Sequence, residues 1–185
     1  MISYLKGTLV EKSPAKVLVD VGGIGYTAEI PLSTFEALGR IGEKITLLTH
    51  LSLKDDHIEL YGFSTPEERD LFLLLLNVSG IGNRTALSIL SHSSINNFKS
   101  AVIRRDREFL SSIHGIGKKT AERIIFELKD RFGKEERSLT GPMEEALMAL
   151  LSLGFKREEA DRALTGVEPN GRPIEEIIRE ALKKL

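Results

Sequence analysis

The sequence predicts a multidomain α+β protein, in which a small β-barrel precedes an all-α segment and a separate three-helix domain. Three observations support this fold class. The first third contains short alternating or β-branched runs separated by glycines, the next part changes to helical periodicity, and a polar stretch ending in Gly-Pro follows. These patterns are typical of strands, helices and a flexible linker. We expect domains over residues 1–63, 64–133 and 143–185, with a linker over 134–142.

The first domain is predicted to contain five strands and one short helix. We place the helix between Ser33 and Leu38, with Ser33 as its cap. Five short strands with one interposed helix are typical of a small Greek-key barrel of the OB type. Such barrels often bind nucleic acid, although the fold alone does not establish that function. The expected strands are 5–10, 17–21, 26–30, 45–53 and 58–61.

Helices are predicted from Thr65 onwards. Thr65-Pro66-Glu67-Glu68 places Pro at the first helical position and Glu three residues after the Thr, which is a capping signal. The last domain has about 43 residues, near the lower size limit for an independent fold. A small tethered helical domain is more often an interaction module than a catalytic one. The expected helices are 66–76, 83–90, 94–103, 106–112, 118–131, 143–152, 156–164 and 173–184.

Two stretches of the helical segment nearly copy each other, 35 residues apart. Residues 78–86 read VSGIGNRTA, and residues 113–121 read IHGIGKKTA. A Gly-x-Gly turn that opens a helix directs unpaired N–H groups and the positive end of the helix dipole at one spot, which suits a phosphate oxygen. The alternative is a tight turn needed only for packing, but such a turn does not need a basic residue at the same position in both copies (Arg84 and Lys119).

The repeat supplies the candidate phosphate-binding residues. Asn83 stands where the second copy has Lys118, so we expect the second copy to carry more of the electrostatic binding. Two phosphate sites with basic residues suggest contact with a nucleic-acid backbone. Arg123 lies about one helical turn beyond Lys119, where its side chain would reach either the nucleic-acid strand bound by Lys119 or Glu127 on its own helix. The candidates are Gly80, Gly82, Asn83, Arg84, Gly115, Gly117, Lys118, Lys119 and Arg123.

Charge is unevenly distributed along a chain whose net charge is −1. Residues 63–133, which contain both turns, carry eleven Lys and Arg against eight Asp and Glu. The segments before and after carry six against eight and nine against eleven. Overall neutrality therefore does not argue against nucleic acid, although it argues against indiscriminate coating of DNA.

Several function classes are disfavoured by the sequence. Around Gly117-Lys118, a Walker phosphate loop would need Gly at position 112 and Ser or Thr at 119, which are Ser and Lys. Gly23-Ile24-Gly25 is followed by a strand pattern, so no helix is expected there to hold a dinucleotide. The four His residues show no ligand spacing and cysteine is absent, so we expect no metal and no cofactor. Without a signal peptide or a membrane-spanning run, a cytoplasmic protein is expected.

The order of these parts resembles the RuvA family over essentially the whole chain. Leu60-Tyr61-Gly62-Phe63 resembles the family's junction between its first two domains, and residues 118–123 followed by Glu127-Leu128-Lys129 resemble its second helix-hairpin-helix motif. The pattern from Ala146 to Phe155 resembles the start of its ubiquitin-associated-like (UBA-like) C-terminal fold. The resemblance implies two helix-hairpin-helix motifs in the central domain and a UBA-like three-helix domain at the end.

The resemblance also implies a function in DNA recombination and repair. Members of the family bind four-way (Holliday) junction DNA as homotetramers, sometimes paired into octamers, and hold the junction open. They recruit the RuvB ATPase for branch migration through the tethered domain, and the RuvC nuclease acts on the same junctions. ATP hydrolysis then belongs to the partner, and this chain is expected to be a non-catalytic DNA-binding subunit.

Asp55-Asp56 lies in the last turn of the predicted barrel. The resemblance places acidic residues there at the centre of the tetramer, as a pin. Four copies of two carboxylates at a crossover would repel phosphates, which would disfavour ordinary duplex while the basic turns attract the arms. The alternative interpretation is a solvent-exposed hairpin turn, which is what such a pair usually is.

Two other functions compete with junction binding. DNA glycosylases and some structure-specific nucleases also use helix-hairpin-helix motifs, but a glycosylase needs a catalytic Asp beside a base-sized pocket. The second motif here runs on as one helix, without a separate aspartate-bearing loop, and the strong carboxylate pair lies in the barrel. An adaptor for single strands is disfavoured by only three Tyr, eight Phe and no Trp, because stacking platforms normally need more.

Overall fold

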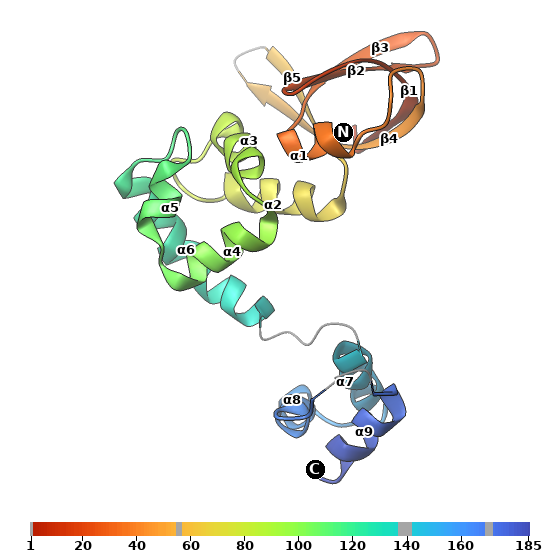
Figure 1. The fold of residues 1–185 in the computed structure, drawn as a ribbon, viewed down its shortest axis with the longest axis vertical. Helices are drawn as coiled ribbons and strands as arrows, with labels where there is room; N and C mark the ends of the chain where they lie inside the picture. The colour runs from red at the N-terminus through yellow and green to blue at the C-terminus, as the bar shows by residue number, and fades with distance from the viewer. Residues whose placement is uncertain (1, 55–56, 137–141, 169–171) are drawn as a thin grey trace. The chain divides into compact units, whose positions relative to one another are not determined.

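The computed structural model of the chain describes residues 2–54, 57–136, 142–168 and 172–185 (Figure 1). It divides into two compact units, Met1–Asp130 and Arg131–Leu185. The first contains the strands and the helices of the repeat, and the second contains the last three helices. All the sequence-predicted site residues lie in the first unit.

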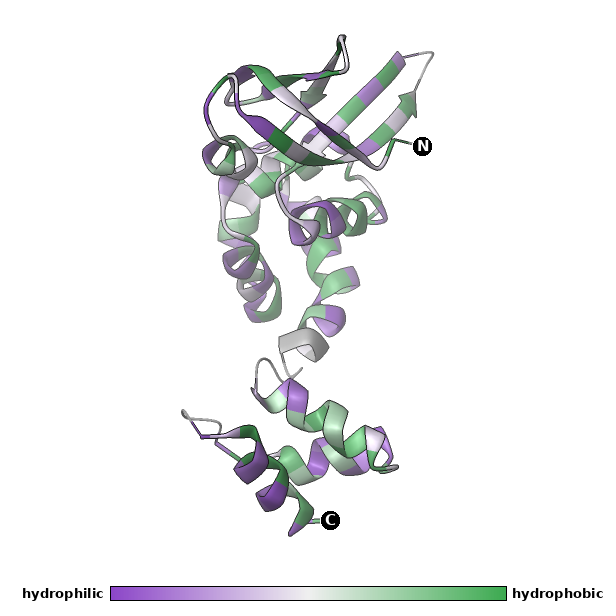
Figure 2. Ribbon diagram, turned by 90° about the vertical axis from the view of Figure 1, so that its right-hand side faces the viewer, coloured by the Kyte–Doolittle hydropathy of each residue, from purple (hydrophilic) through white to green (hydrophobic). Residues whose placement is uncertain are grey.

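The first unit begins with a closed five-stranded barrel in the order β1-β2-β3-β5-β4. All neighbouring pairs are antiparallel except β3 and β5, which are parallel where Glu29 pairs with Tyr61. Hydrophobic and hydrophilic residues alternate along the strands in Figure 2, as expected when one face of each strand points inward. The predicted OB-type barrel is confirmed. Its strands are β1 (Tyr4–Ser13), β2 (Lys16–Val21), β3 (Ile24–Glu29), β4 (Lys44–Lys54) and β5 (His57–Phe63).

A short helix, α1 (Leu32–Ala37), follows β3, as predicted, but Ser33 is not its cap. Pro31 holds the N-cap position, and its ring makes no side-chain capping bond. Ser33 lies inside the helix, where its hydroxyl donates to the carboxylate of Glu68. The prediction was wrong because the helix begins at Leu32, one residue before Ser33, so Ser33 cannot occupy the N-cap position.

Five helices follow the barrel, and their starts follow the sequence signals; the last of them, α6, runs past the end of the first unit at Asp130. Thr65 accepts a hydrogen bond from the backbone N–H of Glu68, and the Glu68 side chain returns to the Thr65 N–H, so the predicted capping box is confirmed. Helix α6 ends five residues later than expected and overlaps the start of the predicted linker. The helices are α2 (Pro66–Leu76), α3 (Asn83–His92), α4 (Ile95–Arg104), α5 (Arg107–Ser112) and α6 (Lys118–Glu136).

Aromatic contacts join the barrel to the helices of the first unit. The ring of Phe72 on α2 is fully buried. Its centroid lies 4.9 Å from that of Phe63 and 5.2 Å from that of Tyr61, both on β5. Such tilted pairs add to the stabilisation from buried area. The contacts fix the helix that leads into the first turn of the repeat against the barrel wall.

Glu68 is a buried carboxylate that links α1 to the start of α2. Only 6% of the residue is exposed, and its oxygens accept hydrogen bonds from the hydroxyls of Thr34 and Ser64 at 2.8 Å, and from that of Ser33. Burial alone would raise the pKa of Glu68, but the bonds from Ser33, Thr34 and Ser64 outweigh it and hold the pKa below its ordinary value. The charged form is therefore the stable one at neutral pH.

The second unit is a three-helix domain made of α7 (Pro142–Ser152), α8 (Arg157–Leu164) and α9 (Ile174–Leu182). Its apolar side chains form one core that includes residues from all three helices. Leu164 is 1% exposed and belongs to this core. The apolar side chains that stay exposed are Met148, Leu153, Leu182 and Leu185.

Replacing Glu68 tests how much this linkage stabilises the fold. Glu68→Ala removes the acceptor of the buried Thr34 hydroxyl and of the partly buried Ser64 hydroxyl, so we expect the free energy of unfolding at pH 7 to fall by about 2–4 kcal/mol in urea denaturation. Because the folded-state pKa is lowered, the contribution of Glu68 is present above the unfolded-state pKa of about 4.5 and is lost as pH falls through the folded-state pKa.

Glu67→Ala is the matched control, because Glu67 is exposed in the same helical turn. It should cost only a few tenths of a kcal/mol through the helix dipole. Equal losses for the two variants would mean that the buried hydrogen bonds of Glu68 contribute nothing of their own.

Candidate nucleic-acid interface

The two copies of the repeat adopt the same backbone turn. Gly80 and Gly115 have φ angles of +91° and +87°, a conformation that L side chains rarely adopt. The N–H of Ile81 donates to the carbonyl of Val78 at 3.0 Å, and the equivalent bond in the second copy has the same length. The similarity of sequence is therefore a similarity of geometry.

Each turn delivers the chain into a helix whose N-terminus has no capping side chain. Helices α3 and α6 follow Gly82 and Gly117, and the first helical bonds, to the carbonyls of these glycines, are 2.9 Å in both. The first N–H groups of each helix are left for an external acceptor. The neighbouring helices α2, α4 and α5 differ, since in each of them a side chain accepts a hydrogen bond from a backbone N–H of the first turn. Those capping residues are Thr65, Ser94 and Asp106.

Exposed cations surround these N-termini. Arg84 lies in the first turn of α3, and Lys118 and Lys119 begin α6; all three residues are exposed. Neither helix has an acidic residue in its first turn. Unpaired N–H groups, the positive helix end and a basic side chain therefore act together at each turn. This combination favours a phosphate oxygen as the ligand.

Asn83 attaches the first turn to the barrel. Its Nδ2 donates to the Oγ of Ser52, on β4, at 2.9 Å. Lys118 at the equivalent position of α6 is exposed. The substitution of Asn for Lys therefore exchanges a charge at the surface for a bond between the helices and the barrel. Sequence analysis gave no signal for Ser52, because a single serine in a strand forms no pattern.

Arg84 lies close to a carboxylate of the barrel. The hydroxyl of Tyr61 donates to Glu59 at 2.6 Å and holds the pKa of Glu59 below its ordinary value, and the positive charge of Arg84 acts in the same direction. Burial, together with Glu59, raises the pKa of Tyr61. Glu59 offsets part of the Arg84 charge, so the first turn presents a weaker positive potential than the two lysines of the second.

Arg123 forms hydrogen bonds to the first turn. From α6, its Nη1 donates to the backbone oxygen of Ser79 at 2.8 Å and to the Ser79 Oγ at 2.9 Å. These two bonds to Ser79 account for the position of the Arg123 side chain without the ion pair to Glu127 that the sequence offered. Arg123 was predicted to contact a nucleic-acid strand, and that assignment stays a prediction. Ser79 was missed by the sequence analysis.

The predicted acidic pin, Asp55 and Asp56, lies outside the residues that the structure describes. The strands on either side end at Lys54 and begin again at His57, and these two residues are paired across β4 and β5. The position of the pair in the sequence is therefore between two antiparallel strands, and its role stays a prediction.

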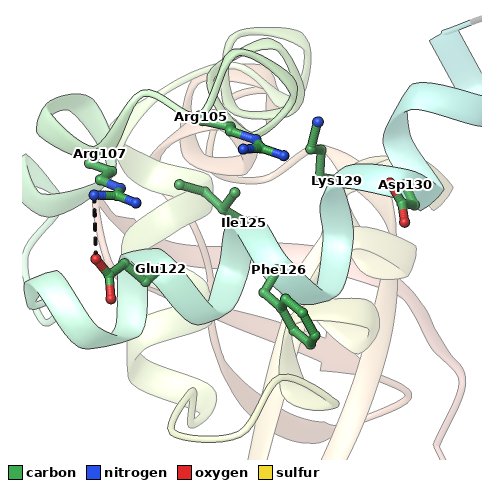
Figure 3. Close-up of a pocket in the computed structure, with 7 residues that line it drawn as sticks. All are labelled: Arg105, Arg107, Glu122, Ile125, Phe126, Lys129 and Asp130. Atoms are coloured by element: carbon green, nitrogen blue, oxygen red, sulfur yellow. Dashed lines mark ion pairs between the residues drawn. The ribbon is translucent and has the colours of Figure 1, made fainter.

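A separate open groove of about 550 Å³ runs along the outer face of α6 (Figure 3). At one end Arg107 and Glu122 form an ion pair of 3.5 Å, and the ring of Phe126 is 87% exposed at its border. The groove shares no lining residue with the two turns, so it is distinct from the candidate interface. Its lining residues are Arg105, Arg107, Glu122, Ile125, Phe126, Lys129 and Asp130.

The described residues offer no metal site and no membrane-spanning helix. These residues contain no group of three or more His, Cys, Asp or Glu arranged to hold a metal ion. Within the same part of the chain, no helix has the length and apolar character needed to cross a membrane. The repeated turns are therefore the arrangement from which a function is best argued.

Comparison with known proteins connects the whole chain to one family. The family model described as "RuvA N terminal domain" matches residues 1–62, "SAM-like Helix-hairpin-helix tandem" matches 72–130, and "RuvA, C-terminal domain" matches 141–185. Proteins named "Holliday junction branch migration complex subunit RuvA" from Burkholderia thailandensis and Methylibium petroleiphilum are each 44% identical over 100% of this chain, covering 98% and 99% of their own lengths. One from Stutzerimonas stutzeri is 40% identical over 99% of this chain and 98% of its own length. The chain belongs to the RuvA family.

Proposed function

We propose that this chain binds four-way junction DNA and serves as the junction-binding subunit of a branch-migration complex. The observation that carries the proposal is the pair of equivalent, uncapped helix N-termini, each with exposed cations. Membership of the RuvA family and the names of the relatives support the same conclusion. Contacts to phosphates, without base readout, make the binding specific for DNA shape and tolerant of sequence.

The interface follows from the geometry of the turns. The four glycines allow close approach of the backbone, while Lys118, Lys119 and Arg84 supply charge. Asn83 offers its backbone N–H to the strand while its side chain bonds to the barrel. The residues assigned to the interface are Gly80, Gly82, Asn83, Arg84, Gly115, Gly117, Lys118 and Lys119. Arg123, the remaining candidate from the sequence, donates to Ser79 in the first turn, so it is assigned to the support of that turn.

Assembly would complete the site. Four copies around a junction bring four barrels together, with Asp55 and Asp56 facing the crossover, where they repel phosphates of ordinary duplex. The three-helix domain, with its exposed Met148, Leu153 and Leu182, offers an apolar surface to a RuvB-type ATPase in the cytoplasm. A RuvC-type nuclease would act on the junction held in this way. The working domains are 1–63, 64–133 and 143–185. The segment 134–142 connects the last two, although α6 extends into it as far as Glu136 and α7 begins at Pro142.

A binding role is favoured over the alternative of a helix-hairpin-helix repair enzyme. A glycosylase or nuclease needs carboxylates beside the bound strand, and the first turns of α3 and α6 contain none. Glu59, the carboxylate near Arg84, is hydrogen-bonded to Tyr61. The family to which the chain belongs also favours the binding role.

The proposed function predicts a preference for junctions over duplex. Affinity for a synthetic four-way junction should exceed that for a duplex of the same arm sequence, and changing the sequence of the arms should leave the preference intact. Fluorescence anisotropy over a series of salt concentrations measures both. Equal affinity for the two DNA forms would reject junction binding and leave a general DNA adaptor.

Lys118→Ala combined with Lys119→Ala tests the second turn. For each phosphate that the variant no longer binds, the plot of log affinity against log salt concentration should flatten by about 0.9, because fewer counterions are released. Lys183→Ala with Lys184→Ala in the tail domain is the charge-matched control and should leave the slope unchanged. A slope that stays at its wild-type value in the first variant would remove both lysines from the interface.

Asp55→Asn combined with Asp56→Asn tests the acidic pin. Without four pairs of carboxylates, repulsion of phosphates disappears, so affinity for plain duplex should rise more than affinity for the junction. Asp20→Asn, on β2 of the same barrel, controls for the change of charge. If junction selectivity stays the same, the two residues are an ordinary solvent-exposed turn.

A further inference from the structure

The 35-residue repeat extends to two hydrogen bonds that cross between the motifs. Ser88 on α3 donates from Oγ to the backbone oxygen of His114, in the second turn, at 2.9 Å. Arg123 on α6 donates to the backbone oxygen of Ser79, in the first turn, at 2.8 Å. Positions 88 and 123 differ by 35, as do positions 79 and 114. One contact is therefore made twice, in opposite directions, and we call the two bonds the cross-brace.

Each bond of the cross-brace holds the peptide unit immediately before a turn glycine. The carbonyl of Ser79 lies in the same planar unit as the N–H of Gly80, so fixing the oxygen also fixes the direction of that N–H. The carbonyl of His114 stands in the same relation to Gly115. Both turn glycines have φ near +90°, and at each of them the chain changes direction toward the helix.

The opposite motif also packs on each turn. A methyl group built on Gly80 would lie 3.6 Å from Nη1 of Arg123, and one built on Gly115 would lie 3.5 Å from Oγ1 of Thr85. Thr85 belongs to α3 and Arg123 to α6, so each turn is in contact with the helix of the other motif. The shape of one phosphate-binding turn is therefore set by the motif that carries the other.

We propose that Ser88 and Arg123 are positioning residues, which hold the two turns at a fixed separation so that one DNA arm engages both at once. The inference rests on the proposed function and deepens it. Once one turn is bound, the second contact is intramolecular, and its strength depends on how well the second turn is already placed. Removal of the cross-brace would weaken binding while every phosphate contact stays available.

Salt dependence separates this role from a direct contact. A phosphate contact made by Arg123 would release counterions, so its removal would flatten the salt slope by about 0.9. A positioning residue changes affinity at every salt concentration by the same factor. Ser88 is uncharged, so its removal changes the hydrogen bond of the cross-brace without changing the charge of the interface. Because Ala is a better helix former than Ser, Ser88→Ala should not weaken binding by destabilising α3.

The first experiment measures binding of the full-length protein to a synthetic four-way junction across a salt series. Ser88→Ala removes one hydrogen bond and Arg123→Ala removes two, and each variant should weaken binding by about three- to tenfold with unchanged salt slope. Ser88→Thr retains the hydroxyl and should restore wild-type affinity. Arg104→Ala removes an exposed arginine of the same unit and should leave affinity and slope nearly unchanged.

The second experiment measures amide hydrogen exchange in the free protein, without DNA. The N–H groups of Ile81 and Ile116 are bonded within the two turns, to Val78 and Ile113. Because the brace is crossed, Ser88→Ala should accelerate exchange mainly at Ile116, and Arg123→Ala mainly at Ile81. A general loss of stability would instead accelerate both amides in both variants.

Different outcomes reject different statements. A flatter slope for Arg123→Ala, with Ser88→Ala binding like wild type, would overturn the positioning role and assign Arg123 to a phosphate. Unaltered exchange at both isoleucines would overturn the cross-brace itself. If the wild-type protein fails to prefer the junction, the proposed function falls, while a crossed exchange pattern would still establish that each motif shapes the turn of the other.

Discussion

The central constraint on the first unit is that two helices, α3 and α6, begin without a capping side chain. Backbone N–H groups at the start of a helix need an acceptor, and α3 and α6 follow glycines that cannot supply one. The other helices of the central segment use Thr, Ser or Asp for this purpose. Under the proposed function this difference has a physical reason, because a cap formed by the protein would compete with a phosphate for the same donors. Gly80 and Gly115 adopt positive φ angles and carry no side chain, so a ligand can approach the backbone closely at each turn.

The rest of the first unit holds these two ends in place. The buried carboxylate of Glu68 and the ring of Phe72 fix α2 against the barrel, and α2 leads into the first turn. Asn83 then bonds the start of α3 to Ser52 of the barrel. The N-terminus of α3 therefore has a defined position against β4, the strand that ends at Lys54.

The two turns are equivalent in backbone but unequal in charge. The second presents two exposed lysines, whereas the first presents one arginine whose charge Glu59 partly offsets. In the first turn, Asn83 bonds to the barrel where the second turn has a charged residue, Lys118. The charge of Lys118 stays exposed and available to a ligand. Reciprocal bonds from Ser88 and Arg123 keep this unequal pair in a symmetric frame. Geometry and electrostatics are thus divided between different residues of the same repeat.

The sequence by itself determined the order of parts, the five strands, the helices and the two Gly-x-Gly turns, because periodicity and glycine requirements are local properties. The cross-brace was not visible in the sequence, because Ser79 and His114, like Ser88 and Arg123, stand at equivalent positions of the repeat but differ in residue type. Only the tertiary structure decided that Ser33 bonds to Glu68 instead of capping α1, and that Asn83 reaches Ser52. These contacts join residues more than thirty positions apart, and a single polar residue does not announce a distant partner. Packing of the barrel against the helices brings them together.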